Sequence, residues 1–338
     1  MNRLVYRTPK AGSLEDLKLS SESLSDPLEE EVTIEVKAIG LNFADVFALV
    51  GLYSATPKGS FIPGLEYSGN VIKTGAKVKN FKIGDRIMGV TRFGGYVSHL
   101  NSNTSYIHPL PSNWSYQEGA AFIAQALTAY YALFPLGNLQ KGQTVLIHSA
   151  AGGVGIYANR IAKKFDAYTI GTIGDSSKIQ TLKSEGYDDY IIRDSNFPTQ
   201  LKNKLKDRSL NLVLECIGGK IFQSSFDSLS PTGRIVVYGA AHFAPESSSP
   251  NFFKLAYQYL TRPRIDPLSM ISSNKSVLAF NLIWLWDKMD ELSKMLEQIL
   301  DLKLPPPLIG KTFPFTEALD ALYYFKSGKS VGKIILQT

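Results

Sequence analysis

The sequence contains very little cysteine and histidine for its length. Among 338 residues there are one cysteine, Cys216, and four histidines. A single cysteine excludes an intrachain disulfide, and it excludes every zinc site that is built from several cysteines. The scarcity of cysteine also favours a reducing compartment, so we expect a cytoplasmic protein.

Long hydrophobic runs are missing as well. The longest apolar stretch, Leu278 to Trp286, is interrupted by Asn281 and is much shorter than the roughly 20 residues that span a bilayer. The first residues, MNRLVYRTPKAG, are charged and contain no apolar segment typical of a secretory signal. We therefore expect no transmembrane segment, although the basic pI of about 9.1 leaves room for peripheral contact with a membrane.

No block of like charges stands out in the chain. The 36 lysines and arginines exceed the 30 aspartates and glutamates by 6, and both signs are scattered along the sequence. Scattered charges are typical of a solvated surface rather than of a nucleic-acid patch. We therefore predict no nucleic-acid partner.

The pattern of the chain changes once along its length. Residues 32–108 contain short β-like runs separated by Gly, Pro and Asn, which indicates an all-β module. From residue 144 strands alternate with helices, which predicts a doubly wound parallel sheet with its ligand at the carboxyl ends of the strands. A break at residues 305–307, all proline, precedes a final strand, VGKIILQ. A chain of this length is expected to form two domains.

A glycine-rich turn follows the first strand of this second part. The octet HSAAGGVG (148–155) lies between the apolar run TVLI and a predicted helix. Glycine there permits positive φ, close approach to a pyrophosphate and tight packing of the helix on the sheet. Because glycines also occur in ordinary strand-to-helix turns, the octet alone leaves both interpretations open.

Several stretches together carry a resemblance to a known family. They are GLNFADVFALVGLY (40–53), PGLEYSGNVIKTG (63–75), FKIGDRIMG (81–89), ALTAYYAL (126–133) and HSAAGGVG (148–155). They resemble the zinc-independent quinone oxidoreductases of the medium-chain dehydrogenase/reductase superfamily. Three later stretches are most similar to the vesicle amine transport protein homologues: YQYLTRPRIDPL (257–268), NKSVLAFNL (274–282) and VGKIIL (331–336).

The resemblance covers nearly the whole chain and implies its architecture. It implies an α/β fold with a GroES-like β domain at residues 1–123 and 302–338 and a doubly wound Rossmann domain at residues 124–301. It also implies NADPH as the cofactor and a homodimer, in which residues 274–282 extend the sheet across two subunits. An ordinary internal strand would explain the same stretch.

Two positions depart from the zinc enzymes of the superfamily. Asn42 stands where those enzymes have a cysteine ligand, and Leu65, in Gly64-Leu65-Glu66, stands where they have a histidine. An amide and an isobutyl group do not replace a thiolate and an imidazole around Zn²⁺. We therefore predict no metal site, and we expect Glu66 to be a structural carboxylate that accepts hydrogen bonds from nearby amides.

The choice of nucleotide depends on the end of the second strand of the parallel sheet. Gly174 occupies the position where an acidic residue would bind the free ribose of NADH, although Asp175 follows it directly. Lys178 and Arg193 offer cations for a 2′-phosphate, or else they are ordinary solvated residues. Thr128 resembles a residue that approaches the cofactor, and we expect Gly152, Gly153, Val154 and Gly155 of the octet to contact it as well. Gly218 and Gly239 end later strands of the same sheet and would let the cofactor pass close by, or else they form ordinary turns.

The resemblance places the catalytic groups in the first domain. Asn42 lies in the implied substrate cleft with Asp45 in support, although the two could simply form a turn that hydrogen-bonds its own backbone. Tyr53 is either a second hydrogen-bond donor or a packed aromatic. Phe47 stands where some relatives have a tyrosine, so a further phenolic donor is missing.

These residues predict a reaction class and a rival to it. We expect an NADPH-dependent, zinc-independent reductase that transfers hydride to quinones or α,β-unsaturated carbonyls. The alternative is an NADPH-binding interaction or membrane-associated protein with little or no turnover.

Overall fold

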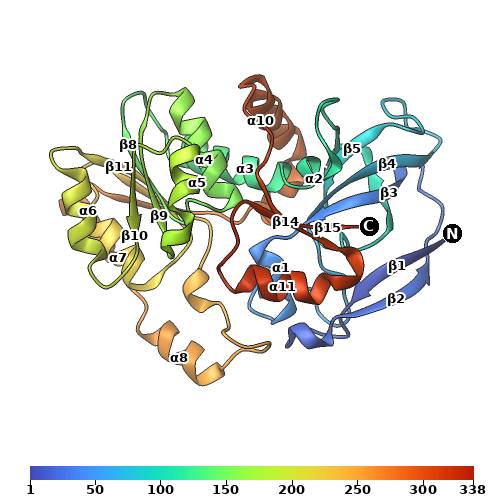
Figure 1. Cartoon of the computed structure of the whole chain (residues 1–338), viewed down its shortest axis with the longest axis horizontal. Coiled ribbons are helices and arrows are strands. Elements are labelled where there is room, and N and C mark those ends of the chain that lie inside the picture. The colour runs from blue at the N-terminus through green and yellow to red at the C-terminus, as the bar shows by residue number, and fades with distance from the viewer.

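Two large β-sheets organise the protein, and a computed structural model describes all 338 residues of it (Figure 1). One sheet is built from strands near both ends of the chain, and the other from the middle. This division agrees with the GroES-like and Rossmann domains expected from the sequence. The predicted boundaries at residues 123/124 and 301/302 fall at the start of helix α3 and at the end of helix α10, and they stay a prediction.

The first sheet has seven strands in the order β14-β15-β3-β4-β5-β7, with β6 paired to β3. Its strands are β3 (Glu31–Gly40), β4 (Glu66–Thr74), β5 (Arg86–Val90), β6 (His99–Asn103), β7 (Ile107–Pro109), β14 (Ile309–Pro314) and β15 (Lys333–Gln337). The last strand of the chain thus pairs with β3, and a separate hairpin of β1 (Asn2–Arg7) and β2 (Lys18–Ser23) lies beside the sheet. Helices α1 (Phe43–Leu49) and α11 (Ala318–Lys326) belong to this domain.

The second sheet is entirely parallel and has six strands in the order β10-β9-β8-β11-β12-β13. The strands are β8 (Thr144–Ile147), β9 (Tyr168–Ile173), β10 (Asp189–Ile192), β11 (Leu210–Glu215), β12 (Arg234–Val237) and β13 (Ser276–Ala279). The helices between them are α4 (Gly153–Lys164), α5 (Ile179–Ser184), α6 (Phe197–Leu205), α7 (Gly219–Asp227), α8 (Phe252–Leu260) and α9 (Pro267–Ser273). Because the order reverses between β8 and β11, a crevice for a nucleotide is expected at their carboxyl ends.

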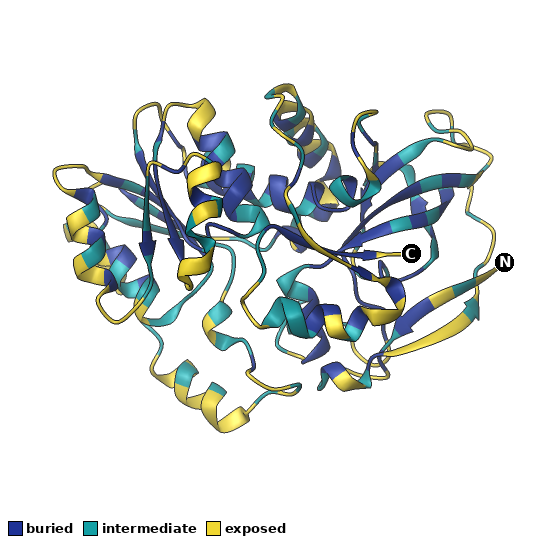
Figure 2. Cartoon of the chain, in the orientation of Figure 1, coloured by how far each residue is buried: buried dark blue, intermediate teal, exposed yellow.

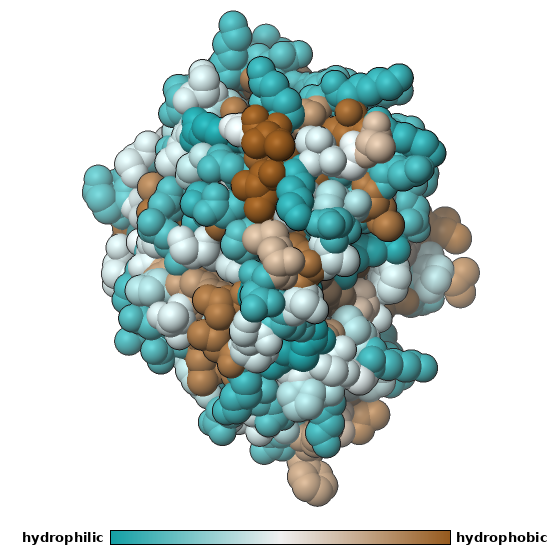
Figure 3. All heavy atoms as spheres, turned by 90° about the vertical axis from the view of Figure 1, so that its right-hand side faces the viewer, coloured by the Kyte–Doolittle hydropathy of each residue, from teal (hydrophilic) through white to brown (hydrophobic).

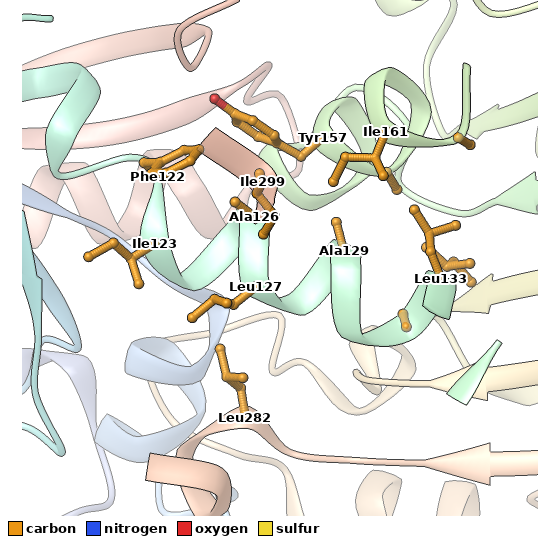
Figure 4. Packing of buried hydrophobic residues seen from close by; sticks show 14 of the residues in the cluster. Phe122, Ile123, Ala126, Leu127, Ala129, Leu133, Tyr157, Ile161, Leu282 and Ile299 are labelled. Carbon is orange, nitrogen blue, oxygen red and sulfur yellow. The ribbon is translucent and has the colours of Figure 1, made fainter. Parts of the chain in front are cut away.

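Helix α3 (Ile123–Tyr131) links the two domains through the largest hydrophobic core. It follows α2 (Tyr116–Gly119) in the chain and packs on α4 and α10 (Met289–Asp301). Figure 4 shows α3 between side chains of α4 and Leu282, and Phe122 meets Tyr157 edge-on at 5.4 Å between ring centres. The helical stretch Tyr116–Leu136 has the length and apolar character to cross a membrane, but 61% of its most apolar window is buried. Its hydrophobicity is therefore explained by its place in the core.

The parallel sheet has two edge strands, β10 and β13, and exposed helices precede the second of them. Strand β13 pairs with β12 and with no other strand, and helices α8 and α9 before it have no buried residue. Figure 2 shows α8 almost wholly exposed at the bottom of the molecule, whereas the strands of both sheets are mostly buried. The face at the N-terminal side, seen in Figure 3, is largely hydrophilic with narrow, interrupted apolar patches.

Candidate active site

The glycine-rich octet lies at the carboxyl end of β8, where the sheet order reverses. The His148 amide donates to the carbonyl of Leu214 at 3.1 Å, and α4 begins at Gly153 with Gly152 as its N-cap. A Cβ on Gly155 would lie 2.6 Å from the Ser149 carbonyl oxygen, and one on Gly153 would lie 1.6 Å from the Gln125 side-chain amide. Gly155 therefore requires glycine because backbone atoms fill the space, whereas a Cβ at Gly153 would displace the Gln125 side chain.

The expectation of positive φ at these glycines was wrong. Gly152 has a φ of −85°, and neither Gly153 nor Gly155 has a positive φ. Ser149 adopts the left-handed conformation instead, with a φ of 50°. The tight turn occurs before the glycines, and their role in the fold is close packing. Around Gly152 the only atom near an added Cβ is the Ser149 carbonyl oxygen, at 3.2 Å, so a ligand can approach the helix N-terminus there.

Three cationic residues lie around Gly174 and Asp175 at the end of β9. Arg193 lies nearest: its Nη2 would be 3.5 Å from a Cβ on Gly174, and its Nη1 donates to Thr172 Oγ1 at 2.6 Å. Lys178 donates to the carbonyl oxygens of Gly328 and Ser330, the latter at 2.8 Å. Lys329 stands between these two acceptors in the sequence, and sequence reasoning missed it because it is far along the chain.

Electrostatics around Gly174 agree with this arrangement. Burial lowers the pKa of Lys178, and the nearby Arg193 lowers it further. The pKa of Asp175 is lowered by its hydrogen bonds with Ser177, with smaller effects from Lys178 and Lys329. Asp175 is thus exposed, ionised and engaged in capping the next turn. The group is short of negative charge and could hold a doubly charged phosphate.

The two later glycines lie at the carboxyl ends of neighbouring strands. Gly218 has a φ of 89°, and its amide donates to Glu215 Oε1 at 3.0 Å. Gly239 packs on Cys216, whose Cβ would be 2.9 Å from an added Cβ. Burial raises the pKa of Glu215 to about 7 against the opposing effect of these backbone hydrogen bonds. Thr128, on α3, donates its hydroxyl to the Ala124 carbonyl at 2.6 Å.

Asn42 belongs to a buried polar cluster that the sequence did not indicate. Its Nδ2 donates to Glu66 Oε1 at 2.9 Å and to the Gly40 carbonyl at 3.3 Å, and its Oδ1 accepts from Lys333 Nζ at 2.9 Å. Lys333 also pairs with Glu66, and both side chains are 2% exposed or less. Glu66 Oε2 in turn accepts from the Ala124 amide at 3.2 Å. The expectation that Glu66 satisfies nearby amides thus describes part of its role, since it also neutralises a buried ammonium ion.

Asp45 is hydrogen-bonded to the backbone of Asn42 and fixes the turn on which Asn42 stands. Its carboxylate accepts hydrogen bonds from the Asn42 amide at 2.8 Å, the Gly64 amide at 3.2 Å and the Tyr96 hydroxyl at 3.2 Å. Complete burial raises its pKa to about 7, although these donors and the charge of Lys333 oppose the rise. The turn that joins Asn42 to Asp45 is therefore real, and it positions Asn42 at the start of α1.

Tyr53 connects the two domains. It packs against both large hydrophobic cores and edge-on to Phe93. Its hydroxyl donates to Asn281 Oδ1 at 2.7 Å, and Asn281 follows β13 at the carboxyl edge of the parallel sheet. Burial raises the pKa of Tyr53 to about 12, so the phenol stays protonated at neutral pH. Sequence reasoning found Tyr53 but missed Asn281. The available signal for Asn281 was that it is a polar residue within an apolar run.

Asn42 and Leu65, which stand at the positions of zinc ligands in related enzymes, make other contacts in this chain. Leu65 is 5% exposed and packs in the largest hydrophobic core, while Asn42 is bound to Glu66 and Lys333. No group of three or more histidine, cysteine, aspartate or glutamate side chains is arranged to hold a metal ion. The ammonium group of Lys333 lies against Glu66, the carboxylate that Asn42 contacts.

Comparisons with known proteins match both halves of the chain. The alcohol dehydrogenase GroES-like domain family matches residues 28–121, and the zinc-binding dehydrogenase family matches residues 153–282. The chain is 30% identical over 331 residues to the human synaptic vesicle membrane protein VAT-1 homolog, covering 96% of this chain and 84% of the relative.

Solved structures agree over the full length. The quinone oxidoreductase of Escherichia coli complexed with NADPH has 26% identity and a TM-score of 0.82, with 100% of each chain covered. The CurK enoyl reductase has 26% identity and a TM-score of 0.82, with 99% of each chain covered. The fold and the glycine-rich turn thus define an oxidoreductase of the medium-chain dehydrogenase/reductase superfamily.

Within that superfamily, the chain belongs with the VAT-1 homologues and is similar in structure to quinone oxidoreductases.

Proposed function

We propose that this protein is an NADPH-dependent reductase that transfers hydride to a quinone or an α,β-unsaturated carbonyl without a catalytic metal. The observation that carries the proposal is the position of Tyr53. A protonated phenol from the first domain meets the carboxyl edge of the parallel sheet, the edge where nucleotides bind in this class of fold. A donor for the substrate thereby lies beside the expected cofactor crevice.

The residues of the crevice fit NADPH. The space over Gly152 at the N-terminus of α4 suits a pyrophosphate, and the cations Lys178, Arg193 and Lys329 suit a 2′-phosphate. NADPH supplies the hydride when it is bound, and the protein orients the reactants and excludes water. The NADPH in the E. coli quinone oxidoreductase structure supports this choice.

The charge that develops during the reaction favours a conjugated acceptor. Hydride addition to a saturated ketone makes an alkoxide on the attacked carbon, which a metal ion stabilises in zinc enzymes. Addition to a conjugated acceptor makes a more stable enolate whose charge lies on a distant oxygen, so neutral donors suffice. The quinone oxidoreductase and enoyl reductase among the similar structures support both acceptor classes.

Two side chains can serve that distant oxygen. Tyr53 can turn its hydroxyl from Asn281 to the substrate. Asn42 can exchange its long hydrogen bond to the Gly40 carbonyl, 3.3 Å from Nδ2, for one to the substrate. Asp45 keeps Asn42 in place. Removing one such donor typically costs about 2.7–4 kcal/mol of transition-state stabilisation in other enzymes.

The proposal is tested by NADPH oxidation with a panel of quinones and enones. Saturable turnover that survives extensive chelator treatment and falls at least tenfold in Tyr53→Phe supports it, with Tyr106→Phe as a matched control outside the cleft. Tight NADPH binding without turnover on any acceptor would favour the alternative, an interaction or membrane-associated protein. Activity lost together with stoichiometric zinc would overturn the metal-free reaction.

The β13 edge of the parallel sheet supports a homodimer. Strand β13 offers unpaired backbone groups, and α9 leads directly into it. Phe253 of α8 is 92% exposed and Ile271 of α9 is 72% exposed, which is unusual for apolar side chains of a monomer. A second copy of the chain that pairs along β13 and covers these helices would satisfy the unpaired backbone groups and bury the exposed apolar side chains.

A further inference from the structure

The buried ammonium group of Lys333 has a complete set of acceptors, and they come from different parts of the fold. Its Nζ contacts Glu66 at the start of β4 and Asn42 at the start of α1. When the Gln125 side-chain amide is oriented to satisfy its neighbours, its oxygen accepts from Lys333 Nζ at 2.8 Å and its nitrogen donates to the Ala121 carbonyl. An ammonium group has three hydrogens, and each has one partner here.

The same lysine is connected to the glycine-rich loop through its neighbour Gly332 and its partner Gln125. Gly332, its neighbour in the chain, donates its amide to the Ala151 carbonyl at 2.8 Å and forms a bridge with Gly152. Gln125, its partner on α3, fills the space beside Gly153, so a Cβ there would displace the Gln125 side chain. Residues 332 and 333 therefore contact the loop through the backbone and, by way of Gln125, through a side chain.

We infer that Lys333 is a positioning residue that holds Asn42 in the substrate cleft and couples it to the glycine-rich loop. The inference rests on the proposed function in assigning the first site to the substrate and the second to the nucleotide. A buried charge without its partner is strongly unfavourable, so Asn42, Glu66 and Gln125 are held in one arrangement as long as Lys333 is present. A shift of the loop moves Gln125 and Gly332, and Lys333 transmits that shift to Asn42.

The experiment compares Lys333→Met and Gln125→Leu with Lys82→Met, a lysine on the surface of the same domain, as the control. Lys333→Met alone leaves the Glu66 carboxylate without its partner. The double variant Lys333→Met/Glu66→Leu therefore removes both charges together and keeps a similar side-chain volume. For each variant we measure Tm, NADPH affinity by fluorescence titration, kcat and KM for an enone, and amide hydrogen exchange in residues 40–46 and 148–155.

Positioning predicts that effects appear at both sites in protein that remains folded. In the double variant kcat should fall about 100-fold with KM changed less, because Asn42 is misplaced. The Kd for NADPH should rise about fivefold or more, and exchange should accelerate in both segments. Gln125→Leu should reproduce the nucleotide effect with a smaller loss of kcat.

A lysine that only stabilises the fold gives a different result. Lower Tm with unchanged kcat, NADPH affinity and exchange in the folded fraction would overturn the inference, even if the wild-type protein is an active reductase. If the wild-type protein has no turnover, the proposed function fails, and NADPH affinity with hydrogen exchange still decides the coupling.

Discussion

At the residue scale, sequence reasoning located the site residues that stand in local motifs. It missed the residues from distant parts of the chain that contact them. Asn42, Asp45 and Tyr53 stand in local motifs that resemble a family. Lys333 contacts Asn42 across 291 positions of sequence, and Asn281 meets Tyr53 across 228. Such pairs depend on how the two ends of the chain return to one corner of the fold, which no local pattern encodes.

The cations around Gly174 should select NADPH over NADH. A charge-assisted contact with a phosphate contributes roughly 1.5–3 kcal/mol, or about ten- to a hundredfold in affinity. Fluorescence titration of both nucleotides should show this preference in the wild type and its reduction in Lys178→Ala, and more strongly in Lys178→Ala/Arg193→Ala. Lys183→Ala, an exposed lysine of α5, the helix that follows Lys178, is the control. Equal affinities in the wild type, unchanged by the substitutions, would contradict the assignment.

Asp45 should make the protein less stable as pH rises. Its folded pKa, raised to about 7, lies above its usual value of 3.8, so the folded state holds this proton more strongly than the unfolded state does. Its contribution is greatest below pH 3.8 and is lost as pH rises to about 7, by at most about 4 kcal/mol.

The measurement is urea unfolding of the wild type and Asp45→Asn between pH 4 and pH 8. The difference in unfolding free energy should move against the wild type as pH rises toward about 7 and level off above it. Glu215, whose pKa is also raised to about 7, is present in both proteins, so its effect cancels in the difference. A difference that does not vary with pH would refute the burial of an acid with a raised pKa.

At the element scale, the strands and the doubly wound sheet could be predicted because their signals are local. Strand β8 is buried along its whole length and reads as an apolar run, and the glycine-rich octet follows it directly. The conformation of the loop could not be predicted, since Ser149 rather than a glycine takes the positive φ. Which glycine is required depends on Gln125 and Ala150, residues that only the folded chain brings close.

Gly155→Ala should damage the nucleotide site. The added Cβ would lie 2.6 Å from the Ser149 carbonyl oxygen and 2.7 Å from Ala150 Cα, so the loop must move. Overpacking of this kind costs about 1–3 kcal/mol. If the whole cost appears as a displaced nucleotide-binding loop, NADPH binding weakens by roughly five- to a hundredfold. Titration with NADPH and a thermal melt measure the two effects.

Gly152→Ala provides the comparison. Its Cβ would meet only the Ser149 carbonyl oxygen, at 3.2 Å, and its φ suits alanine. The Tm of this variant should stay near that of the wild type, and a loss of NADPH affinity would then report close approach of the ligand. Unchanged NADPH binding in both variants would show that the nucleotide lies elsewhere.

At the scale of the whole molecule, the open edge of β13 and the exposed helices α8 and α9 predict a dimer. Sedimentation at micromolar concentration should give twice the chain mass of 37.3 kDa. The amides of Ser276 and Phe280 donate to β12, so the amide of Ala279 points to the open edge by the alternation of a strand. Ala279→Pro should therefore yield monomers that still bind NADPH.

Two outcomes oppose that account. A wild-type monomer at micromolar concentration would contradict the dimer directly. Flotation of the monomer with anionic vesicles, lost in Phe253→Ser/Ile271→Ser, would assign α8 and α9 to a membrane instead. The sequence resemblance predicted the strand that forms the edge, but the exposure of the two helices emerged only from the fold.

The central claim is that the two domains together reduce a conjugated bond, and isotope transfer tests it most directly. An enone and its saturated ketone are incubated side by side with NADPH that carries deuterium at the transferred position, and the products are analysed by NMR. The account predicts faster reduction of the enone, with deuterium at the β-carbon. Preferred reduction of the saturated ketone, with deuterium on the carbinol carbon, would contradict it.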